Sequence, residues 1–247
     1  MEQRLKIKSS WTDHPSCELK HDFISLANAV FGTFVTEDYF KAKFEDDVYG
    51  PSLLTIAYVD GQPAGADVMW RNDLWGVKAY QTVDTCVLKP YRGMGLFKLM
   101  TRWEQEFLGN KTLIYGFPNP NSYPGYVKMG WQVKHLYKTP TFLRKEITTL
   151  NVIESAYASW WLKAQSGILH VQKKEKFYLI RKKKKNPVAT LIGRVDEATA
   201  RLFPESKGAC LFKSFEPRPS IYNKNKSIPL VCNQPTMEIP YWKIDAI

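Results

Sequence analysis

The feature that most constrains the fold is the segment Val87–Phe97, whose sequence is VLKPYRGMGLF. A strand-like run leads directly into a turn with two glycines, and an amphipathic helix follows without a linker. Glycine tolerates the positive φ angles that a backbone adopts when it wraps closely around a phosphate. Such a turn directs several backbone N–H groups to one place, at the positive end of the helix dipole. The segment therefore predicts an α/β fold with a site for an anion, in particular a pyrophosphate.

The helix predicted after this turn begins at Leu96 and stops near Gly109. Charged residues lie off its expected apolar stripe, which is made up of Leu96, Leu99, Met100, Trp103 and Phe107. The residues predicted off that stripe are Lys98, Arg102, Glu104 and Glu106. A strand-to-helix turn that binds nothing is the alternative, because a short Gly-x-Gly match is weak evidence.

A second segment adds specificity. Residues 112–117 read as a short strand, and the sequence PNPNSYPGYVKMGW follows them. In this segment Asn119 precedes Tyr126 by seven residues, and Ser122 lies between these two. Three residues then separate Tyr126 from Gly130, which is followed by Trp131.

These two segments together resemble the GNAT acyltransferase superfamily. That family carries Arg/Gln-x-x-Gly-x-Gly/Ala after its fourth strand, and Arg92, Gly95 and Phe97 occupy those places. Phe97 departs from the pattern, because the family has a small residue there. The second segment matches the family's later motif, with Ser122 at the usual small position. Upstream, helical patterning over 28–49 and a hairpin of 53–59 with 64–70 follow the order of the GNAT fold.

The resemblance implies a mixed, twisted GNAT-type sheet flanked by helices, and acetyl-CoA as the acyl donor. It implies that the cofactor contacts come from the strand end, the turn and the second motif. The expected residues are Cys86, Val87, Leu88, Arg92, Gly93, Met94, Gly95, Leu96, Phe97, Asn119 and Ser122. Asn119 could equally be a turn residue beside Pro120.

Tyr126 matches the tyrosine that acts as general acid in the family, where its hydroxyl protonates the departing thiolate. The alternative is that Tyr126 only packs beneath the cofactor. Asp84 is the leading candidate for the base, because it lies on the strand that leads to the turn, and Asp67 is a weaker second choice. Asp84 could instead be a solvent-facing strand residue. Cys86 is not expected to be a nucleophile, because no histidine is placed by the sequence to activate its thiol.

The net charge of +11 is unevenly distributed. Through Lys145 there are 18 Lys and Arg against 15 Asp and Glu, and afterwards there are 17 against 9. Much of the excess is the run Arg181–Lys185, whose strand-like flanks predict a solvated hairpin tip. A contact with nucleic acid or an anionic surface is the alternative for this run. No zinc-finger or aromatic-basic pattern supports specific reading of nucleic acid.

The second half repeats the order of the first in outline. A helix at 156–162 precedes a strand at 168–171 and the basic hairpin. We therefore expect a catalytic domain over 1–145 and a degenerate GNAT-like or accessory domain over 146–247. The four cysteines are widely spaced and predict no metal site. No apolar run is long enough to span a membrane, and the first residues contain no apolar signal core. The expected compartment is the cytoplasm.

The function expected from the resemblance is transfer of an acetyl group from acetyl-CoA to a primary amine by direct attack. An amino sugar is the first candidate acceptor, followed by another small amine or a protein amine. One alternative is a regulatory module that binds acyl-CoA without turnover, which the bulk of Phe97 favours. Another is a tandem GNAT-type aminoacyl transferase that uses charged tRNA, which the basic second half would suit. The intact turn at Arg92–Gly95 argues against the tRNA-dependent reading.

Overall fold

The computed structural model of the 247-residue chain describes residues 4–32, 35–74, 76–141, 152–162, 169–173, 176–182, 188–206, 211–216 and 227–234. They belong to two compact units. The first contains Met1–Val133 and Val231–Met237, and the second contains Lys134–Leu230 and Glu238–Ile247. This division differs from the contiguous domains suggested by the sequence, because a late segment returns to the first unit.

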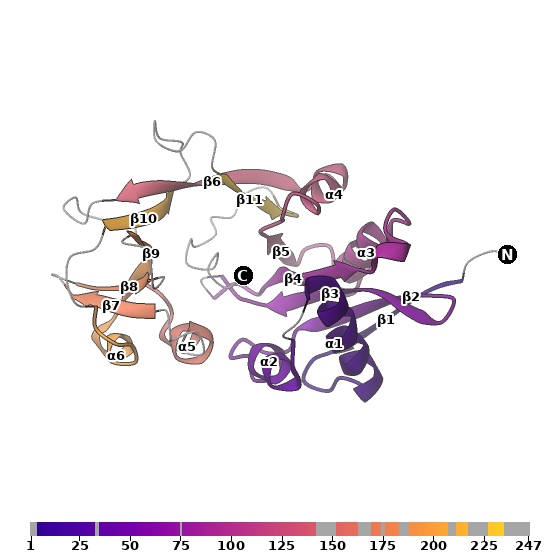
Figure 1. Cartoon of the computed structure of the whole chain (residues 1–247), viewed down its shortest axis with the longest axis horizontal. Coiled ribbons are helices and arrows are strands. Elements are labelled where there is room, and N and C mark those ends of the chain that lie inside the picture. Colours follow the sequence, from indigo (N-terminus) through magenta and orange to yellow (C-terminus); the bar gives the residue numbers. More distant parts are fainter. Residues whose placement is uncertain are drawn as a thin grey trace. The chain divides into compact units, whose positions relative to one another are not determined.

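The first unit is a mixed sheet with helices on both faces (Figure 1). Its elements are β1 (Leu5–Trp11), α1 (Cys17–Phe31), α2 (Glu37–Phe40), the π-helical turn η1 (Lys41–Glu45), β2 (Leu53–Val59), β3 (Gln62–Arg71), β4 (Ala79–Val87), the 3₁₀ turn η2 (Lys89–Tyr91), α3 (Leu96–Leu108), β5 (Leu113–Gly116) and α4 (Tyr123–Lys128). The α/β class predicted from the sequence is confirmed.

Strand β4 is where the sheet opens. Strands β1 to β4 pair antiparallel in order, whereas β4 and β5 run parallel from Ala79↔Leu113 to Thr82↔Gly116. Beyond Thr82, β4 continues without a described strand on its β5 side. A bulge at Asp84, whose φ is +53°, shifts the register against β3 at this point. Bulges bend a strand and interrupt its ladder, so this one helps to separate β4 from β5.

The two faces of the sheet are covered by different helices. Tyr58 on β2 donates a hydrogen bond to Asp22 of α1 at 2.6 Å. Its neighbours Ala57 and Val59 pack with Leu96 and Met100 of α3. Since successive strand residues point to opposite faces, α1 and α3 lie on opposite sides of β2.

The face under α1 holds an aromatic cluster. Phe23 of α1 contacts Phe40 and Phe44, with ring centroids 5.5 and 6.1 Å away. All three side chains are fully buried. Helix α1 itself begins at a Ser16 cap and ends at Gly32, whose φ is +78°.

A segment from late in the chain completes the first unit. Residues Val231 and Cys232, the end of β11 (Ser227–Cys232), pair antiparallel with Gly116 and Tyr115 of β5. Asn233 then binds the backbone on both sides of Leu113. Its side chain accepts from the Ile114 N–H at 2.9 Å and donates to the Thr112 carbonyl at 2.8 Å. This amide thus fixes the end of β11 to β5.

The second unit has its own strand series. Its elements are β6 (Gln132–Thr141), α5 (Ser155–Tyr157), the π-helical turn η3 (Ala158–Leu162), β7 (Leu169–Lys173), β8 (Phe177–Arg181), β9 (Val188–Val195), α6 (Glu197–Ala200), β10 (Leu211–Glu216) and the start of β11. The predicted hairpin is confirmed, since β8 and β9 pair antiparallel. Lys183–Lys185 of the basic run lie outside the described residues.

The pairing pattern of the second unit repeats that of the first. Strands β7, β8 and β9 are successively antiparallel, and β9 and β10 are parallel. The same succession occurs in β2, β3, β4 and β5. The connection between the parallel strands differs, because the four-residue α6 replaces the glycine turn and α3.

Candidate functional site

The predicted anion turn has the expected backbone geometry. Gly93 and Gly95 have φ values of +88° and +78°, and Gly95 is the N-cap of α3. Helix α3 has no side-chain cap, and its first internal bond is from the Leu99 N–H to the Gly95 carbonyl at 3.0 Å. In the part of the chain that the structure describes, the N–H groups of Gly95, Leu96, Phe97 and Lys98 have no hydrogen-bond partner. These groups form a row of donors beside the exposed Arg92.

The end of β4 beside this turn offers one residue to a ligand. The Leu88 N–H donates to Ala64 of β3 at 2.9 Å, so it is not free for a cofactor arm. Alternate residues direct their backbone groups to opposite edges, so Val87 faces away from β3. The Arg92 guanidinium donates to the Val87 carbonyl at 3.1 Å. Cys86 is buried, and this burial raises the pKa of its thiol to about 12, which keeps it protonated.

Tyr126 lies under the opening between β4 and β5. Its side chain is buried, and its hydroxyl is 2.6 Å from that of Thr82. Burial raises the pKa of Tyr126 well above its usual range, and the negative charge of Asp67 adds to this effect. The phenol is therefore a proton donor and not a base at neutral pH.

Phe97, the residue that departs from the family pattern, packs against Tyr126. The two rings meet edge to face with centroids 4.9 Å apart. A Cβ atom on Gly125 would come within 2.4 Å of the Phe97 ring. Gly125 is thus the residue that makes room for the large side chain at the family's small position.

Asn119 and Ser122 form a turn at the start of α4. The Asn119 carboxamide oxygen accepts from the N–H groups of Asn121 and Ser122 at 2.9 and 3.0 Å. Its backbone carbonyl accepts from the Tyr123 N–H at 3.0 Å. These bonds favour the turn role of Asn119, which positions the segment that carries Tyr126.

Asp84 is held by two residues that the sequence did not single out. Its Oδ2 accepts from Lys43 Nζ at 2.9 Å and from the Tyr39 hydroxyl at 3.3 Å. Lys43 also donates to the Tyr39 oxygen at 2.8 Å and is 3% exposed. Burial is the largest influence and lowers the pKa of Lys43, but Asp84 and Tyr39 together outweigh it, so the net shift of the Lys43 pKa is upward. The ion pair uses Asp84 Oδ2, and Asp84 Oδ1 lies outside it.

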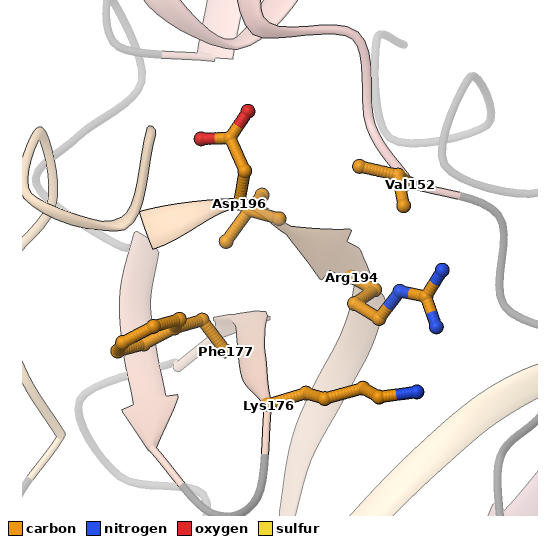
Figure 2. A pocket seen from close by; sticks show the side chains of 6 residues that line it. Val152, Lys176, Phe177, Arg194 and Asp196 are labelled. Carbon is orange, nitrogen blue, oxygen red and sulfur yellow. The ribbon is translucent and has the colours of Figure 1, made fainter. Parts of the chain in front are cut away.

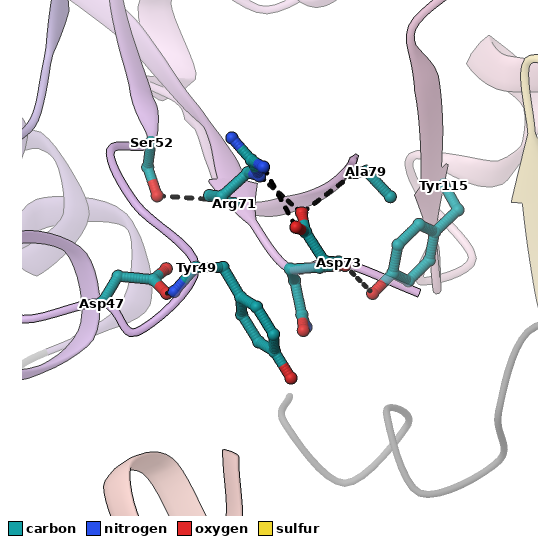
Figure 3. Close-up of polar contacts among 8 residues, drawn as sticks. Asp47, Tyr49, Ser52, Arg71, Asp73, Ala79 and Tyr115 are labelled. Carbon is teal, nitrogen blue, oxygen red and sulfur yellow. Dashed lines mark hydrogen bonds and ion pairs between the residues drawn. The ribbon is translucent and has the colours of Figure 1, made fainter. Parts of the chain in front are cut away.

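The start of β4, at the other end from the turn, is fixed by polar contacts (Figure 3). Asp73 forms an ion pair with Arg71 and accepts from the Ala79 N–H at 3.2 Å. The Tyr115 hydroxyl donates to the Asn72 carbonyl at 3.2 Å, which ties β5 to the same turn. These contacts fix the start of β4 to the turn that precedes it and to β5.

The second unit contains a shallow pocket of about 360 Å³. The Lys176 and Arg194 side chains extend along one side of it, while the Asp196 carboxylate points elsewhere (Figure 2). Two cations, one carboxylate and the Phe177 ring favour no single class of ligand.

Among the described residues, no cluster of His, Cys, Asp or Glu could hold a metal ion. None of the helices in the described ranges has the length and apolar character needed to cross a bilayer.

Two buried carboxyls at the site were not expected. Asp67 on β3 was only a second choice as a base, and Glu104 was predicted to face away from the core. Both are 0% exposed. Conversely Leu99, Trp103 and Phe107, from the predicted apolar stripe, are 40–49% exposed. The helix was thus predicted with the correct span, and Leu96 and Met100 of the stripe are buried as expected, but Thr101 and Glu104 complete the buried face in place of the other three.

No family model and no curated protein matches the sequence. Solved structures do match. A GCN5-related N-acetyltransferase from Kribbella flavida aligns over 93% of this chain and 71% of its own, at 12% identity and a TM-score of 0.57. A conserved Enterococcus faecalis protein of unknown function, considered an N-acyltransferase, aligns over 98% of this chain and 74% of its own. The identity is 12% and the TM-score is 0.56. A proposed acetyltransferase from Pyrococcus horikoshii aligns over 96% of this chain and 92% of its own. The identity is 12% and the TM-score is 0.53.

At this level of identity the likeness is one of fold. It extends over nearly the whole chain in all three cases. The chain therefore has the GNAT fold, as its two motifs indicated.

Proposed function

We propose that this protein transfers an acetyl group from acetyl-CoA to a primary amine. The observation that carries the proposal is the opening of the sheet after Thr82↔Gly116, with the uncapped turn of α3 beside it. The turn, the free edge of β4 and Tyr126 all belong to the first unit. A thioester carrier with a pyrophosphate and an amide-containing arm suits these three features.

The donor set fits a pyrophosphate. Four backbone N–H groups at a helix N-terminus, together with the Arg92 guanidinium, would bind its oxygens. A Cβ at Gly93 or Gly95 would meet no protein atom within 4 Å, so open space lies in front of the turn. Val87 would pair with an amide of the arm at the free edge of β4. Acetyl-CoA would supply the activated acyl group.

Asp84 would receive the acceptor amine. Its Oδ2 is held by Lys43 and Tyr39, and its side chain is 22% exposed, which leaves Oδ1 for an ammonium group. Because Lys43 and Tyr39 hold the other oxygen, Asp84 would orient the amine through Oδ1. A cationic small amine, such as an amino sugar, is the acceptor class that fits best.

Tyr126 would give its proton to the departing sulfur. A thiol has an ordinary pKa of about 8.5, so its thiolate is a moderately good leaving group and needs only modest assistance from the Tyr126 hydroxyl. The amine nitrogen loses a proton as the C–N bond forms, and the sulfur gains one as the C–S bond breaks. A cationic acceptor must first lose a further proton to solvent, so an ammonium group releases one proton overall. The proton lost from nitrogen as the amide forms replaces, through solvent, the one that Tyr126 gives to sulfur.

One observation favours the alternative of a binding module without turnover. Phe97 covers the Tyr126 ring, and Tyr126 is only 2% exposed. Turnover requires the Phe97 side chain to move when the carrier binds.

The second unit would be a degenerate repeat. Its strand succession matches that of the first, but the Asp196 carboxylate caps α6 and accepts from the Thr199 N–H at 2.7 Å. A carboxylate therefore occupies the type of helix N-terminus that stays open in the first unit. On this basis we expect the second unit not to bind the carrier.

The test combines calorimetry with an acceptor screen in which released thiol is detected. We expect acetyl-CoA to bind the wild-type protein and the Tyr126→Phe variant alike, and the phenylalanine variant to turn over at least roughly tenfold more slowly. Gly95→Trp should abolish binding. Leu99→Trp, which places the same side chain on the exposed face of α3, is the control and should bind normally.

Unchanged affinity in Gly95→Trp would overturn the proposed pyrophosphate site. Binding without thiol release for any amine would favour the non-catalytic module. Stabilisation by charged tRNA alone would favour an aminoacyl transferase instead.

A further inference from the structure

Two hydroxyl groups meet at the closed end of the opening between β4 and β5. The pairing of these strands ends at Thr82, which lies opposite Gly116. The Thr82 hydroxyl oxygen is 2.6 Å from that of Tyr126, and both side chains are buried. Hydroxyl pairs in proteins are most often about 2.7–2.8 Å apart. The two groups are therefore already close enough for a strong hydrogen bond.

The Tyr126 ring is held in place by other aromatic rings. The Phe97 ring meets it edge to face, with centroids 4.9 Å apart. Trp131 packs against it at a centroid distance of 4.7 Å. Turnover requires Phe97 to move, and Trp131 and the Thr82 hydroxyl would then hold the ring. The phenol oxygen is thus directed at one place on β4.

The Thr82 side chain is fixed from the β5 side by Gly116. A Cβ atom on Gly116 would lie 2.9 Å from Thr82 Cγ2, so the threonine methyl group occupies the space that a larger residue at 116 would need. Threonine is branched at Cβ, which restricts its χ1 angle. With the methyl group against Gly116, the hydroxyl stays directed at Tyr126.

The contact between the two hydroxyls can run in either direction. One hydroxyl hydrogen lies between the oxygens, which leaves the other for a further acceptor. Once Tyr126 has given up its proton, the phenolate has no hydrogen, so Thr82 must be the donor. Rotation of the Thr82 hydroxyl about its C–O bond produces this arrangement without moving any heavier atom.

A donor at this place matters because the phenol is buried. Burial raises the pKa of Tyr126 well above its usual range, since a phenolate is poorly stabilised away from water, and the charge of Asp67 adds to the rise. The hydrogen bond with Thr82 acts to lower this pKa. Hydrogen bonds from a hydroxyl to a charged oxygen are stronger than those to a neutral one, and are about 2.5–2.7 Å long. The observed contact already has a length suited to the phenolate.

We infer that Thr82 is a positioning residue for acyl transfer: its hydroxyl donates to the Tyr126 oxygen, leaves the Tyr126 hydrogen for the departing sulfur, and stabilises the phenolate that results. This inference rests on the proposed function, in which Tyr126 is the proton donor. The Tyr126 proton passes to sulfur as the C–S bond breaks, and Thr82 keeps its own proton throughout. The phenolate then regains a proton through solvent. Thr82 acts through Tyr126 and does not touch the substrates.

Thr82→Val is the informative variant, because valine keeps the branched shape and replaces only the hydroxyl. With acetyl-CoA and an accepted amine, we expect kcat to fall roughly fivefold to tenfold with KM unchanged, the effect of losing one hydrogen bond to a developing charge. Thr82→Ser keeps the hydroxyl and should restore most of the rate. In a Tyr126→Phe background, Thr82→Val should lower kcat no further, since the phenol through which it acts is gone.

A second measurement needs no turnover. In NMR spectra of the unliganded protein with isotope-labelled tyrosine, the Tyr126 Cζ signal is identified by its absence from Tyr126→Phe. This signal should move in Thr82→Val and return toward its wild-type position in Thr82→Ser. The control is Thr112→Val, which removes a hydroxyl that donates to the Leu108 carbonyl at 2.6 Å. It should change neither the Tyr126 signal nor kcat.

An unmoved Tyr126 signal in Thr82→Val would overturn the hydrogen bond. Wild-type kcat in Thr82→Val, or an equal loss of rate with and without the Tyr126 hydroxyl, would overturn the positioning role while leaving the proposed function intact. A wild-type protein that releases no thiol with any amine contradicts the proposed function and the role of Thr82 with it, and the NMR signal still decides whether the two hydroxyls are bonded.

Discussion

Asp67→Asn should make the protein more stable at neutral pH, and the gain should disappear in acid. The folded-state pKa of Asp67 is about 6 against an ordinary value of 3.8, so the folded protein holds this proton more tightly than the unfolded chain. The associated stability is fully present below the unfolded pKa and is lost as pH rises through the folded pKa. A shift of roughly two units corresponds to about 3 kcal/mol at 1.36 kcal/mol per unit.

The asparagine keeps the shape of the side chain and can still accept the Thr85 hydrogen bond. Removing the Asp67 charge also relieves Glu104, since that charge raises the pKa of Glu104. We therefore expect the free energy of unfolding of the variant, relative to wild type, to increase by about 3 kcal/mol between roughly pH 4 and pH 7. Urea denaturation followed by tryptophan fluorescence measures this difference at each pH.

The matched control is Glu106→Gln, which removes an exposed carboxyl from α3 without touching Asp67 and should not reproduce the rise of Asp67→Asn. A constant difference for Asp67→Asn would refute the argument, because it would mean that Asp67 titrates alike in the folded and unfolded states. A difference that grows toward acid would refute it as well, since that is the sign expected of a carboxylate stabilised by its surroundings.

Two further predictions concern packing. Gly125→Ala should destabilise the protein by about 1–3 kcal/mol, because its Cβ would lie 2.4 Å from the Phe97 ring. Phe97→Leu should suppress this loss of stability. Additive effects of the two substitutions in the double mutant would contradict the clash. Asn233→Ala should cost about 1–2 kcal/mol through two lost side-chain hydrogen bonds and should speed hydrogen exchange at the Ile114 amide; unchanged exchange there would show that the pairing of β11 with β5 does not depend on this amide.

The turn and its helix could be predicted from the sequence because local signals decide them. Gly93 and Gly95 occupy positive φ, as a close approach to a phosphate requires, and Gly109 follows the last residue of α3. Each of these positions is determined by residues only a few places away. The same is true of the hairpin of β2 and β3, which turns at Asp60 and Gly61.

The charged residues of the site could not be placed in the same way. A glutamate among lysines and arginines reads as solvent-facing, and only the position of Asp67 on a distant strand shows why Glu104 is inside. Lys43 is a similar case, because its partner Asp84 is 41 residues away. Sequence periodicity reports the average hydrophobicity of a face and does not identify buried charges that are paired.

The return of the chain to β5 has a consequence for synthesis. Asn233 and its partner Thr112 are 121 residues apart, so β5 emerges from the ribosome long before the strand that covers its outer edge. At about 5–20 residues per second, that edge stays bare for roughly 6–24 seconds. An unpaired strand edge is a template for pairing with another chain, so β5 is open to such pairing throughout this interval.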